Sequence, residues 1–277
     1  MTDGWRDWSL EETAIWIRVP VAGDDKYSRG VVGVLTGSAE YPGAAVLGVD
    51  AAARAGSGMV RYLGDPEAAR LVLQRRPEIV TAPGRVQSWL IGSGMDAAKR
   101  TGELAGRIRE ALAQKLPTVL DAGALDLAGE ARGPVLLTPH AGELVTLLRG
   151  LGVETDRAAV EAEPELWARR AAELTGATVL LKGAVTHVVA PDRDGIRVRA
   201  GSPWLATAGS GDVLGGVLGA LLAAQSERIV EDPSLLAEIA AAGASLHGRA
   251  GDRASAGGPI VALDIAEALP ATIASSL

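Results

Sequence analysis

The residues with the clearest chemical potential form the turn Gly209-Ser210-Gly211-Asp212, which precedes a small, apolar run ending near Ala224. Glycines let backbone N–H groups turn inward and approach an anion without a Cβ clash. A helix beginning here would add unpaired N–H groups and a positive dipole end. The pattern therefore predicts a phosphate or oxyanion site made by the amides of Gly209, Ser210 and Gly211. Asp212 would be either a helix cap or a general base for a substrate hydroxyl.

Two further segments carry candidate ligand contacts. Lys182-Gly183 ends an expected strand, where the ammonium could pair with a phosphate or stay solvated, and the hairpin that begins near Thr186 could bind a base edge through its backbone. His140 ends another expected strand, so it is either a ligand contact or part of the loop, whereas His247 lies in an expected helix and is interpreted as structural. Because the three histidines are far apart, the sequence predicts no metal-binding cluster of side chains.

These motifs lie between short apolar runs and helical patterns that alternate along the chain. We expect an N-terminal helix at 9–17, because Ser9 and Glu12 fit a capping box. The expected strands are 31–35, 59–63, 89–91, 118–120, 135–137 and 178–181, followed by a hairpin of 187–189 and 196–198. The other expected helices are 44–55, 67–74, 97–114, 142–149, 164–174, the glycine-rich helix after Asp212, 234–250 and 264–269.

Strands that alternate with helices predict an α/β fold with a mostly parallel central sheet and helices on both faces. In such sheets ligands bind beyond the carboxyl ends of the strands. The polar and glycine-bearing motifs gather at those ends: Gly37-Ser38, Gly92-Ser93-Gly94, Asp121, His140 and Lys182-Gly183. We therefore expect one domain over residues 1–277, with residues 1–20 as a helical extension, and a ligand site at this edge of the sheet.

Composition excludes several classes of protein. A net charge of −7 opposes nonspecific nucleic-acid binding, and 3% aromatic residues oppose a base-stacking platform. The absence of cysteine excludes disulfides and thiolate chemistry. The N-terminal residues do not resemble a signal peptide and the longest apolar stretch is too short for a membrane span, so we expect no membrane partner and a cytoplasmic location. Neither a Walker motif, a well-placed G-x-G-x-x-G nor a G-x-S-x-G elbow occurs.

Several longer stretches occur together and in one order along the chain. They are K-Y-S-R-G from Lys26, G-S-A-E-Y-P-G-A-A-V-L from Gly37, L-D-A-G-A-L from Leu120, L-T-P-H-A-G-E-L from Leu137, L-K-G-A-V-T from Leu181 and A-T-A-G-S-G-D-V-L-G-G from Ala206. In these stretches the chain resembles the bacterial ADP-dependent NAD(P)H-hydrate dehydratases, which belong to the ribokinase-like superfamily. The G-S-G-D turn alone marks only the superfamily, whereas its combination with L-T-P-H-A-G-E and K-G-A-V-T is far more specific.

The resemblance implies a repair enzyme. It would dehydrate the S epimer of hydrated NADH or NADPH (NADHX or NADPHX), using ADP as co-substrate and releasing AMP and phosphate. Hydroxide leaves poorly and phosphate leaves well, so the added hydroxyl would first be phosphorylated and then eliminated. Asp212 would take the hydroxyl proton while the glycine-turn amides stabilise the transferring phosphoryl group, and Mg²⁺ would help to neutralise the nucleotide phosphates. The preference for ADP over ATP rests on the resemblance alone.

The resemblance also assigns binding residues. Ala45, Gly94, His140 and Asp212 would contact the hydrate, and Lys182, Gly183, Ala184, Val185, Thr186 and Gly211 would contact the adenine nucleotide. The chain departs from the family pattern at two positions near the substrate. Thr36 stands where the family usually has glycine and would add a Cβ beside the substrate loop, and Ser93 replaces a proline that would fix the backbone.

Family members often carry a fused epimerase domain and often form tetramers. The residues before 24 are too few for such a domain, so we expect any epimerase to be a separate protein and the enzyme to be a homo-oligomer. The sequence shows no recognisable cluster of charged residues that would bind a ribose phosphate, so the choice between NADHX and NADPHX stays open.

Two other functions fit parts of the sequence. A ribokinase-like kinase acting on a vitamin-precursor alcohol would share the turn and Asp212 but stop at phosphorylation. A regulatory protein could bind a nucleotide on the same fold without catalysis. The L-T-P-H-A-G-E-L and K-G-A-V-T stretches favour the dehydratase over the kinase, and the presence of Asp212 speaks against the regulatory protein.

Overall fold

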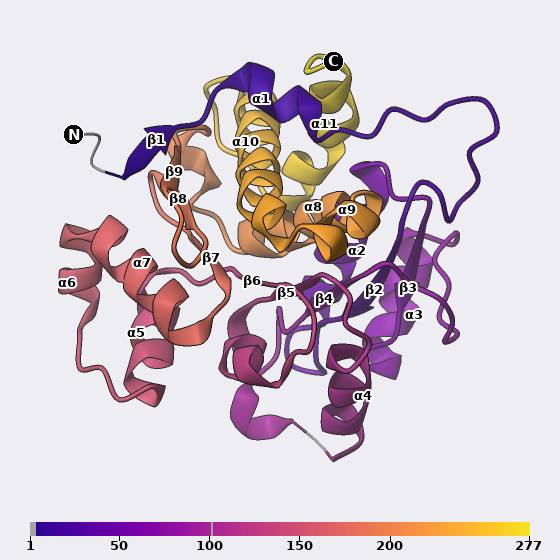
Figure 1. Ribbon diagram of the computed structural model, residues 1–277. Coiled ribbons are helices and arrows are strands. Elements are labelled where there is room, and N and C mark those ends of the chain that lie inside the picture. The colour runs from indigo at the N-terminus through magenta and orange to yellow at the C-terminus, as the bar shows by residue number, and fades with distance from the viewer. Residues whose placement is uncertain (1–3, 101) are drawn as a thin grey trace.

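The computed structural model describes residues 4–100 and 102–277. At its centre lies a sheet with the strand order β1-β9-β8-β7-β6-β5-β4-β2-β3 (Figure 1). The strands are β1 (Trp5–Asp7), β2 (Val31–Leu35), β3 (Met59–Tyr62), β4 (Ser88–Ile91), β5 (Thr118–Leu120), β6 (Val135–Leu137), β7 (Thr178–Leu181), β8 (Thr186–Val189) and β9 (Gly195–Val198). Strand β8 is antiparallel to β7 and β9, and the other neighbouring pairs in the described residues are parallel. The predicted, mostly parallel sheet and its hairpin are confirmed.

Helices cover both faces of this sheet (Figure 1). They are α1 (Leu10–Ile15), α2 (Pro42–Arg54), α3 (Pro66–Arg75), α4 (Gly102–Leu112), α5 (Ala141–Gly150), α6 (Arg157–Ala162), α7 (Pro164–Thr175), α8 (Ser210–Ala224), α9 (Ser226–Glu231), α10 (Leu236–Ser255) and α11 (Ala262–Ala274). Figure 1 shows α8, α10 and α11 on one side of the sheet and α4, α5 and α7 on the other. None of the described helices has the length and apolarity that crossing a membrane requires.

Two apolar cores lie between these layers because successive strand residues point to opposite faces. Val32 and Val34 of β2 pack into the core with α2, α8 and α10, whereas Val31 and Leu35 pack into the core with α4, α5 and α7. All four residues are buried, as expected for a parallel sheet covered on both sides. The sheet therefore holds its strand ends in a fixed order, and these ends carry the polar motifs.

Helix α8 is the central element of the first core. Close packing against α2 depends on Gly216, because a Cβ there would lie 2.2 Å from the carbonyl oxygen of Gly48. This close packing of α8 on α2 leaves most of α8 buried and holds the N-terminal turn of α8 against the sheet. A short, glycine-rich apolar run thus becomes a rigid support for Asp212.

Some elements differ from the expected ones. The helix expected at 97–114 is two elements, a 3-10 helix at Ala97–Lys99 and α4, because Asp96 caps a short turn and Arg100 is extended; residue 101 lies outside the described part. The expected extension 1–20 is not purely helical: after residues 1–3, which are likewise outside, β1 pairs with β9 before α1 begins. Besides β1, the unexpected elements in the described residues are α6, α9 and the 3-10 helices at Ala122–Glu130 and Pro203–Leu205.

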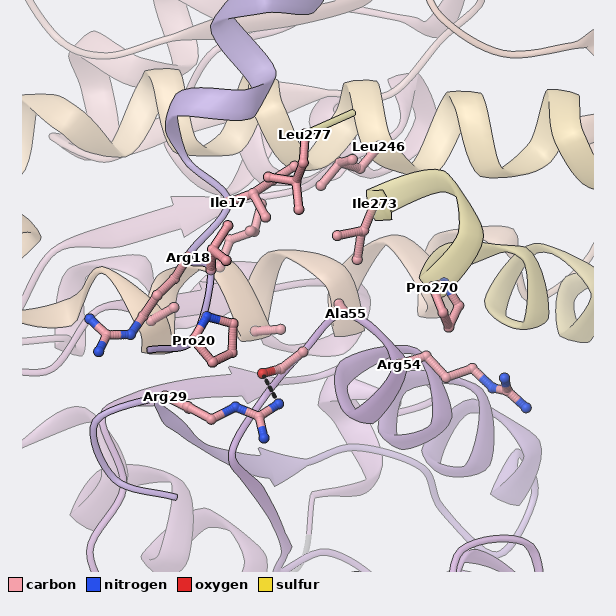
Figure 2. Close-up of a pocket in the computed structure, with 15 residues that line it drawn as sticks. Ile17, Arg18, Pro20, Arg29, Arg54, Ala55, Leu246, Pro270, Ile273 and Leu277 are labelled. Carbon is pink, nitrogen blue, oxygen red and sulfur yellow. Dashed lines mark hydrogen bonds between the residues drawn. The ribbon is translucent and has the colours of Figure 1, made fainter. Parts of the chain in front are cut away.

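A cavity of about 170 Å³ lies at the C-terminal end of α8, between residues 17–20 and α11 (Figure 2). Its wall includes Arg29, which donates a hydrogen bond of 3.1 Å to the carbonyl oxygen of Gly56. The α8 residues that line it begin at Ala220, eight positions after Asp212, which corresponds to about 12 Å along the helix axis. This cavity is therefore separate from the predicted chemistry.

Candidate active site

The turn before α8 requires glycine at Gly209 for two reasons. Gly209 has φ of +88°, a left-handed conformation that residues with a Cβ adopt with strain. A Cβ there would also lie 2.5 Å from Cδ1 of Leu47 and 3.0 Å from Cβ of Ala262. In the part of the chain that the structure describes, no side chain caps α8, so its first amides are free of side-chain acceptors. The predicted turn and helix start are confirmed.

The three predicted anion-binding amides are not equivalent. The N–H of Ser210 already donates to the carbonyl oxygen of Thr207 at 3.3 Å. The Ser210 hydroxyl faces inward and lies 3.2 Å from Nε2 of His247. Burial lowers the pKa of His247 to about 4, so this ring is neutral at pH 7. Ser210 and His247 therefore shape the start of α8, which agrees with the structural interpretation of His247.

Asp212 lies in the first turn of α8 and is partly exposed. Burial raises its pKa to about 6, and the negative charges of Asp121 and Glu143 act in the same direction, against the opposing charge of Lys182. At pH 7 a carboxyl with this pKa is mostly ionised yet more basic than an ordinary aspartate. These are the properties of a general base for a hydroxyl group.

A buried ion pair lies next to this turn. Nζ of Lys182 is 2.8 Å from Oδ1 of Asp121 and 3.6 Å from Oε2 of Glu143. Asp121 also accepts hydrogen bonds of 2.8 Å from the hydroxyls of Ser93 and Thr138. Burial alone would raise the pKa of Asp121, but the Lys182 charge and these hydrogen bonds lower it. The structure thus holds a fully partnered carboxylate at the end of β5 and an ammonium at the end of β7, on the two sides of β6.

Lys182 also reaches the start of α8. A Cβ on Gly211 would lie 3.5 Å from Nζ of Lys182. Burial alone would lower the pKa of Lys182, but the negative charges of Asp121 and Glu143 raise it, so the ammonium keeps its proton. The ammonium therefore lies beside the α8 amides, where it adds positive charge to that of the helix N-terminus.

His140 begins α5 and closes a capping box with Glu143. The N–H of Glu143 donates to Nδ1 of His140 at 3.2 Å, and the N–H of His140 donates to Oε2 of Glu143 at 2.8 Å. The backbone of His140 also forms a parallel bridge to Lys182. Because Nδ1 accepts a hydrogen bond, the ring proton lies on Nε2, and the exposed side chain can donate from that atom.

The segment after β7 contains the residues that were predicted to contact the nucleotide. Gly183 and Ala184 are exposed, whereas Val185 and Thr186 are half-buried where β8 begins. Lys182 turns back toward the α8 start through its side chain. The five residues therefore form one accessible turn beside the α8 amides.

The predicted hydrate contacts Gly94 and Ala45 meet next to Gly37. The N–H of Gly37 donates to the carbonyl oxygen of Ser93 at 2.7 Å. A Cβ on Gly94 would lie 3.2 Å from Cα of Gly37, so glycine permits this approach of the β2 and β4 ends. Ala45 is fully buried against Gly37, so its side chain supports the loop from below. Its contact with the hydrate stays a prediction.

The two departures from the family pattern have different consequences. Thr36 is buried, with an Oγ1 that has no hydrogen-bond partner among the described residues, and its effect on the substrate loop stays a prediction. Ser93 contributes a hydrogen bond to Asp121 that proline lacks. Ser93 therefore connects the β4 loop to the Asp121–Lys182 pair.

Thr138 and Glu143 were not predicted as site residues, and Asp121 was expected at the ligand-binding edge without a role of its own. Asp121 follows β5 directly and Thr138 follows β6 directly. Their position at strand ends was a usable signal, but the sequence alone does not show that they share one hydrogen-bonded cluster. Within residues 4–100 and 102–277, no group of three or more His, Cys, Asp or Glu side chains is arranged to hold a metal ion.

A profile of the NAD(P)H-hydrate dehydratase family matches residues 32–271, which include every predicted site residue. The chain belongs to this family. It is 44% identical over 228 residues to a bifunctional NAD(P)H-hydrate repair enzyme from Mycobacterium tuberculosis; the match covers 77% of this chain and 46% of that protein. The chain thus spans about half the length of the bifunctional relatives. It is 37% identical to an ADP-dependent (S)-NAD(P)H-hydrate dehydratase from Xanthomonas campestris, covering 72% of this chain and 74% of that protein.

Two solved structures have the same fold. An ADP/ATP-dependent NAD(P)H-hydrate dehydratase from Bacillus subtilis, co-crystallised with ATP and Mg²⁺, superposes with a TM-score of 0.82 at 25% identity, covering 98% of both chains. A ribokinase-like superfamily protein from Enterococcus faecalis, 22% identical, superposes with a TM-score of 0.79 over 100% of this chain and 98% of that one. The predicted family and the ribokinase-like fold are both confirmed.

Proposed function

We propose that this protein catalyses the ADP-dependent dehydration of the S epimer of hydrated NADH and NADPH, restoring the reduced nicotinamide and releasing AMP and phosphate. One observation carries the proposal: Asp212, with a pKa of about 6, lies in the first turn of a helix that no described side chain caps, next to Lys182. A base and an anion site at one point are what phosphoryl transfer to a hydroxyl requires. The names of the family relatives supply the substrate class.

The reaction begins at the added hydroxyl of the hydrate. Asp212 accepts the hydroxyl proton as the oxygen forms a bond to the β-phosphorus of ADP, and the bond to AMP breaks. The free amides at the start of α8 and the Lys182 ammonium stabilise the negative charge on the transferring group. The carbon–oxygen bond then breaks with phosphate as the leaving group, and loss of a proton from the adjacent carbon restores the dihydronicotinamide.

The two ligands would approach Asp212 from opposite directions along the sheet edge. We place the hydrate against Gly94 and His140, supported by Ala45, and the adenine nucleotide along residues 182–186 with its phosphates at Gly211. The His140 ring can donate a hydrogen bond to the hydrate from Nε2. Asp121 acts through Lys182, because it holds the ammonium beside the phosphate position.

Magnesium fits this site only through the nucleotide. The described residues offer no cluster of metal-binding side chains, whereas the uncapped start of α8 suits a phosphate group. We therefore propose that Mg²⁺ is held mainly by the ADP phosphates and water, as is usual for this ion, and that it supplies charge neutralisation there. The Bacillus subtilis family member was co-crystallised with ATP and Mg²⁺, so both nucleotides belong in the assay.

The finer predictions about the protein's surroundings stay proposals. We propose that it acts in the cytoplasm as a homo-oligomer, with a tetramer as the state implied by the family resemblance. The separate epimerase expected from the sequence also stays a prediction.

A single assay tests the proposed function. The protein is incubated with Mg²⁺ and chemically hydrated NADH, with ADP, ATP or no nucleotide, and the absorbance of reduced nicotinamide is followed. We expect the absorbance to return with ADP, with AMP and phosphate formed in equal amounts. A phosphorylated hydrate that accumulates without recovery would indicate a kinase. No reaction with either nucleotide, despite tight AMP binding, would indicate a regulatory nucleotide-binding protein.

A further inference from the structure

A cavity of about 380 Å³ opens at the carboxyl ends of β2, β3 and β4. The inner wall is lined by residues that lie just after the ends of these strands: Gly37, Gly64 and Met95. Gly37 and Met95 lie on either side of the predicted hydrate contact Gly94. The volume falls within the range of small-ligand sites, and the cavity adjoins the loops that the proposed function assigns to the substrate.

The sheet order places this cavity on the opposite side of Asp212 from the nucleotide segment. The nucleotide residues follow β7, the buried carboxylate Asp121 follows β5, and the cavity lies beyond β4 at β2 and β3. Neighbouring strands are about 4.8 Å apart, so β2 and β3 lie about 10 and 14 Å from β5. An elongated ligand with its reacting ring at Asp212 can therefore extend into the cavity without meeting the nucleotide.

The walls of the cavity suit a nucleoside. Tyr41 stands at its mouth with 60% of its surface exposed, in a chain with only 3% aromatic residues. Met95, Pro66 and Leu104 provide apolar surface, and polar side chains surround it. An exposed aromatic ring above an apolar wall is a sequence-tolerant platform for a base.

The charges of the cavity disfavour an additional phosphate. Its described lining contains three cations, Lys99, Arg100 and Arg107, and four carboxylates, Glu40, Asp65, Asp96 and Glu103. Each of these cations already has a carboxylate partner: Glu40 binds Lys99 at 2.6 and 2.9 Å, Asp126 binds Arg100, and Glu103 binds Arg107. A dianionic group entering here would meet an excess of negative charge and no unpaired cation among the described lining residues.

We infer that this cavity binds the adenosine half of the hydrated dinucleotide, with the base on Tyr41, and that the Glu40–Lys99 pair makes it select a 2′-hydroxyl over a 2′-phosphate. The inference rests on the proposed function and adds a preference for NADHX over NADPHX. Glu40 and Lys99 act as specificity residues. They lie at the cavity mouth, remote from Asp212, and take no part in the chemical step.

Opposite charge changes test the selectivity. In Glu40→Gln, the ratio of kcat/KM for NADPHX to that for NADHX should rise about three- to fivefold, because an exposed ion pair of this kind contributes roughly 1 kcal/mol or less. In Lys99→Met the same ratio should fall. Glu161→Gln is the matched control, because Glu161 is as exposed as Glu40, forms a comparable pair with Arg157, and does not line the cavity. Its ratio should equal that of the wild type.

The aromatic platform is tested separately. Tyr41→Ala should raise KM for NADHX about tenfold, the usual effect of losing one base–aromatic stack, and leave KM for ADP unchanged. Tyr41→Phe keeps the ring and should behave as the wild type. If Tyr41→Ala changes neither hydrate's KM, or the ratio is the same in Glu40→Gln and Lys99→Met, the cavity does not bind the adenosine half.

Failure of the proposed function would be recognised independently. If the wild type restores no reduced nicotinamide from either hydrate, the dehydratase proposal is wrong. The cavity is then judged by titrating the same variants with NADH and NADPH and following nicotinamide fluorescence. The wild type should bind NADH more tightly than NADPH. A preference for NADH that is smaller in Glu40→Gln and larger in Lys99→Met would support the cavity as a dinucleotide site. Equal binding of both in all variants would overturn it.

Discussion

Nζ of Lys182 lies 2.8 Å from Oδ1 of Asp121, so a single buried contact joins the end of β7 to the end of β5 beside the start of α8. Asp121 is almost completely buried and also holds the hydroxyls of Ser93 and Thr138. The pair has two effects on Asp212: the Asp121 charge raises its pKa and the Lys182 charge lowers it. The pair therefore positions the cation and sets the basicity of Asp212.

Removing the buried carboxylate charge should destabilise the protein. In Asp121→Asn, the Lys182 ammonium loses its partner at 2.8 Å and keeps Glu143 at 3.6 Å as its ion-pair partner among the described residues. Breaking a buried ion pair on one side leaves an uncompensated charge, so we expect a loss of about 3 kcal/mol of unfolding free energy in urea titrations. The double variant Asp121→Asn/Lys182→Met removes both charges and should recover most of that loss. A loss below about 1 kcal/mol in the single variant would mean that the contact does not stabilise the fold.

The pH dependence of activity should report the pKa of Asp212. Because its pKa is about 6, kcat/KM should be constant above pH 7 and fall as the pH drops through 6 and the base becomes protonated. Asp121→Asn removes a negative charge near Asp212 and takes from Lys182 its nearest carboxylate partner. Both changes favour the ionised form of Asp212 and lower its pKa. The acid limb of the profile should therefore move to lower pH in this variant. If the acid limb stays in place or moves to higher pH, the ionisation that limits activity is not that of Asp212.

Turnover should depend on the carboxylate itself. Asp212→Asn keeps the size and the helix position of the side chain but removes the base, so we expect kcat to fall at least about a hundredfold with nucleotide affinity nearly unchanged. Asp156→Asn is the matched control, because Asp156 caps α6 by accepting the N–H of Ala159 and asparagine also caps helices well. The control should retain full activity. Near-normal turnover in Asp212→Asn would make Asp212 a helix element without a catalytic role.

Most of the fold follows from local patterns. Short apolar runs identified β2 and β5–β7, and the turn at Gly209 was recognised from its glycines before a small, apolar run. The motifs at the strand ends then had to meet at one edge, since parallel strands place their carboxyl ends together. The dehydratase family was recognised from six stretches in order, and the family profile confirms it.

The remaining features depend on contacts between distant segments. Strand β1 exists because residues 5–7 find an unpaired edge at β9, which no local pattern reveals. Asp121 and Glu143 become site residues only because Lys182 reaches both from β7. Ser210 was predicted to offer its amide to an anion, yet its N–H donates to Thr207, a choice set by the geometry of the turn. The cavity charges were also missed, because Glu40 and Lys99 are 59 positions apart.

The raised pKa of Asp212 should also appear in stability. The native carboxyl has a pKa of about 6, above the ordinary value of 3.8, so the native state binds this proton more tightly than the unfolded state does. Unfolding free energy from this group therefore decreases as the pH rises from 4 to 6, by at most about 3 kcal/mol for a shift of this size. The asparagine side chain in Asp212→Asn has no charge to bury, so this variant should be more stable than the wild type at pH 8.

The comparison of the two proteins isolates this effect, because all other groups titrate in both. Urea unfolding at pH 4, 6 and 8 should give a stability difference that is small at pH 4 and grows in favour of Asp212→Asn toward pH 8. If Asp212→Asn gains stability and loses turnover, the ionised Asp212 carboxylate costs stability in the wild type and is required for catalysis. A difference that does not change with pH would place Asp212 in an environment as well solvated as that of an ordinary aspartate.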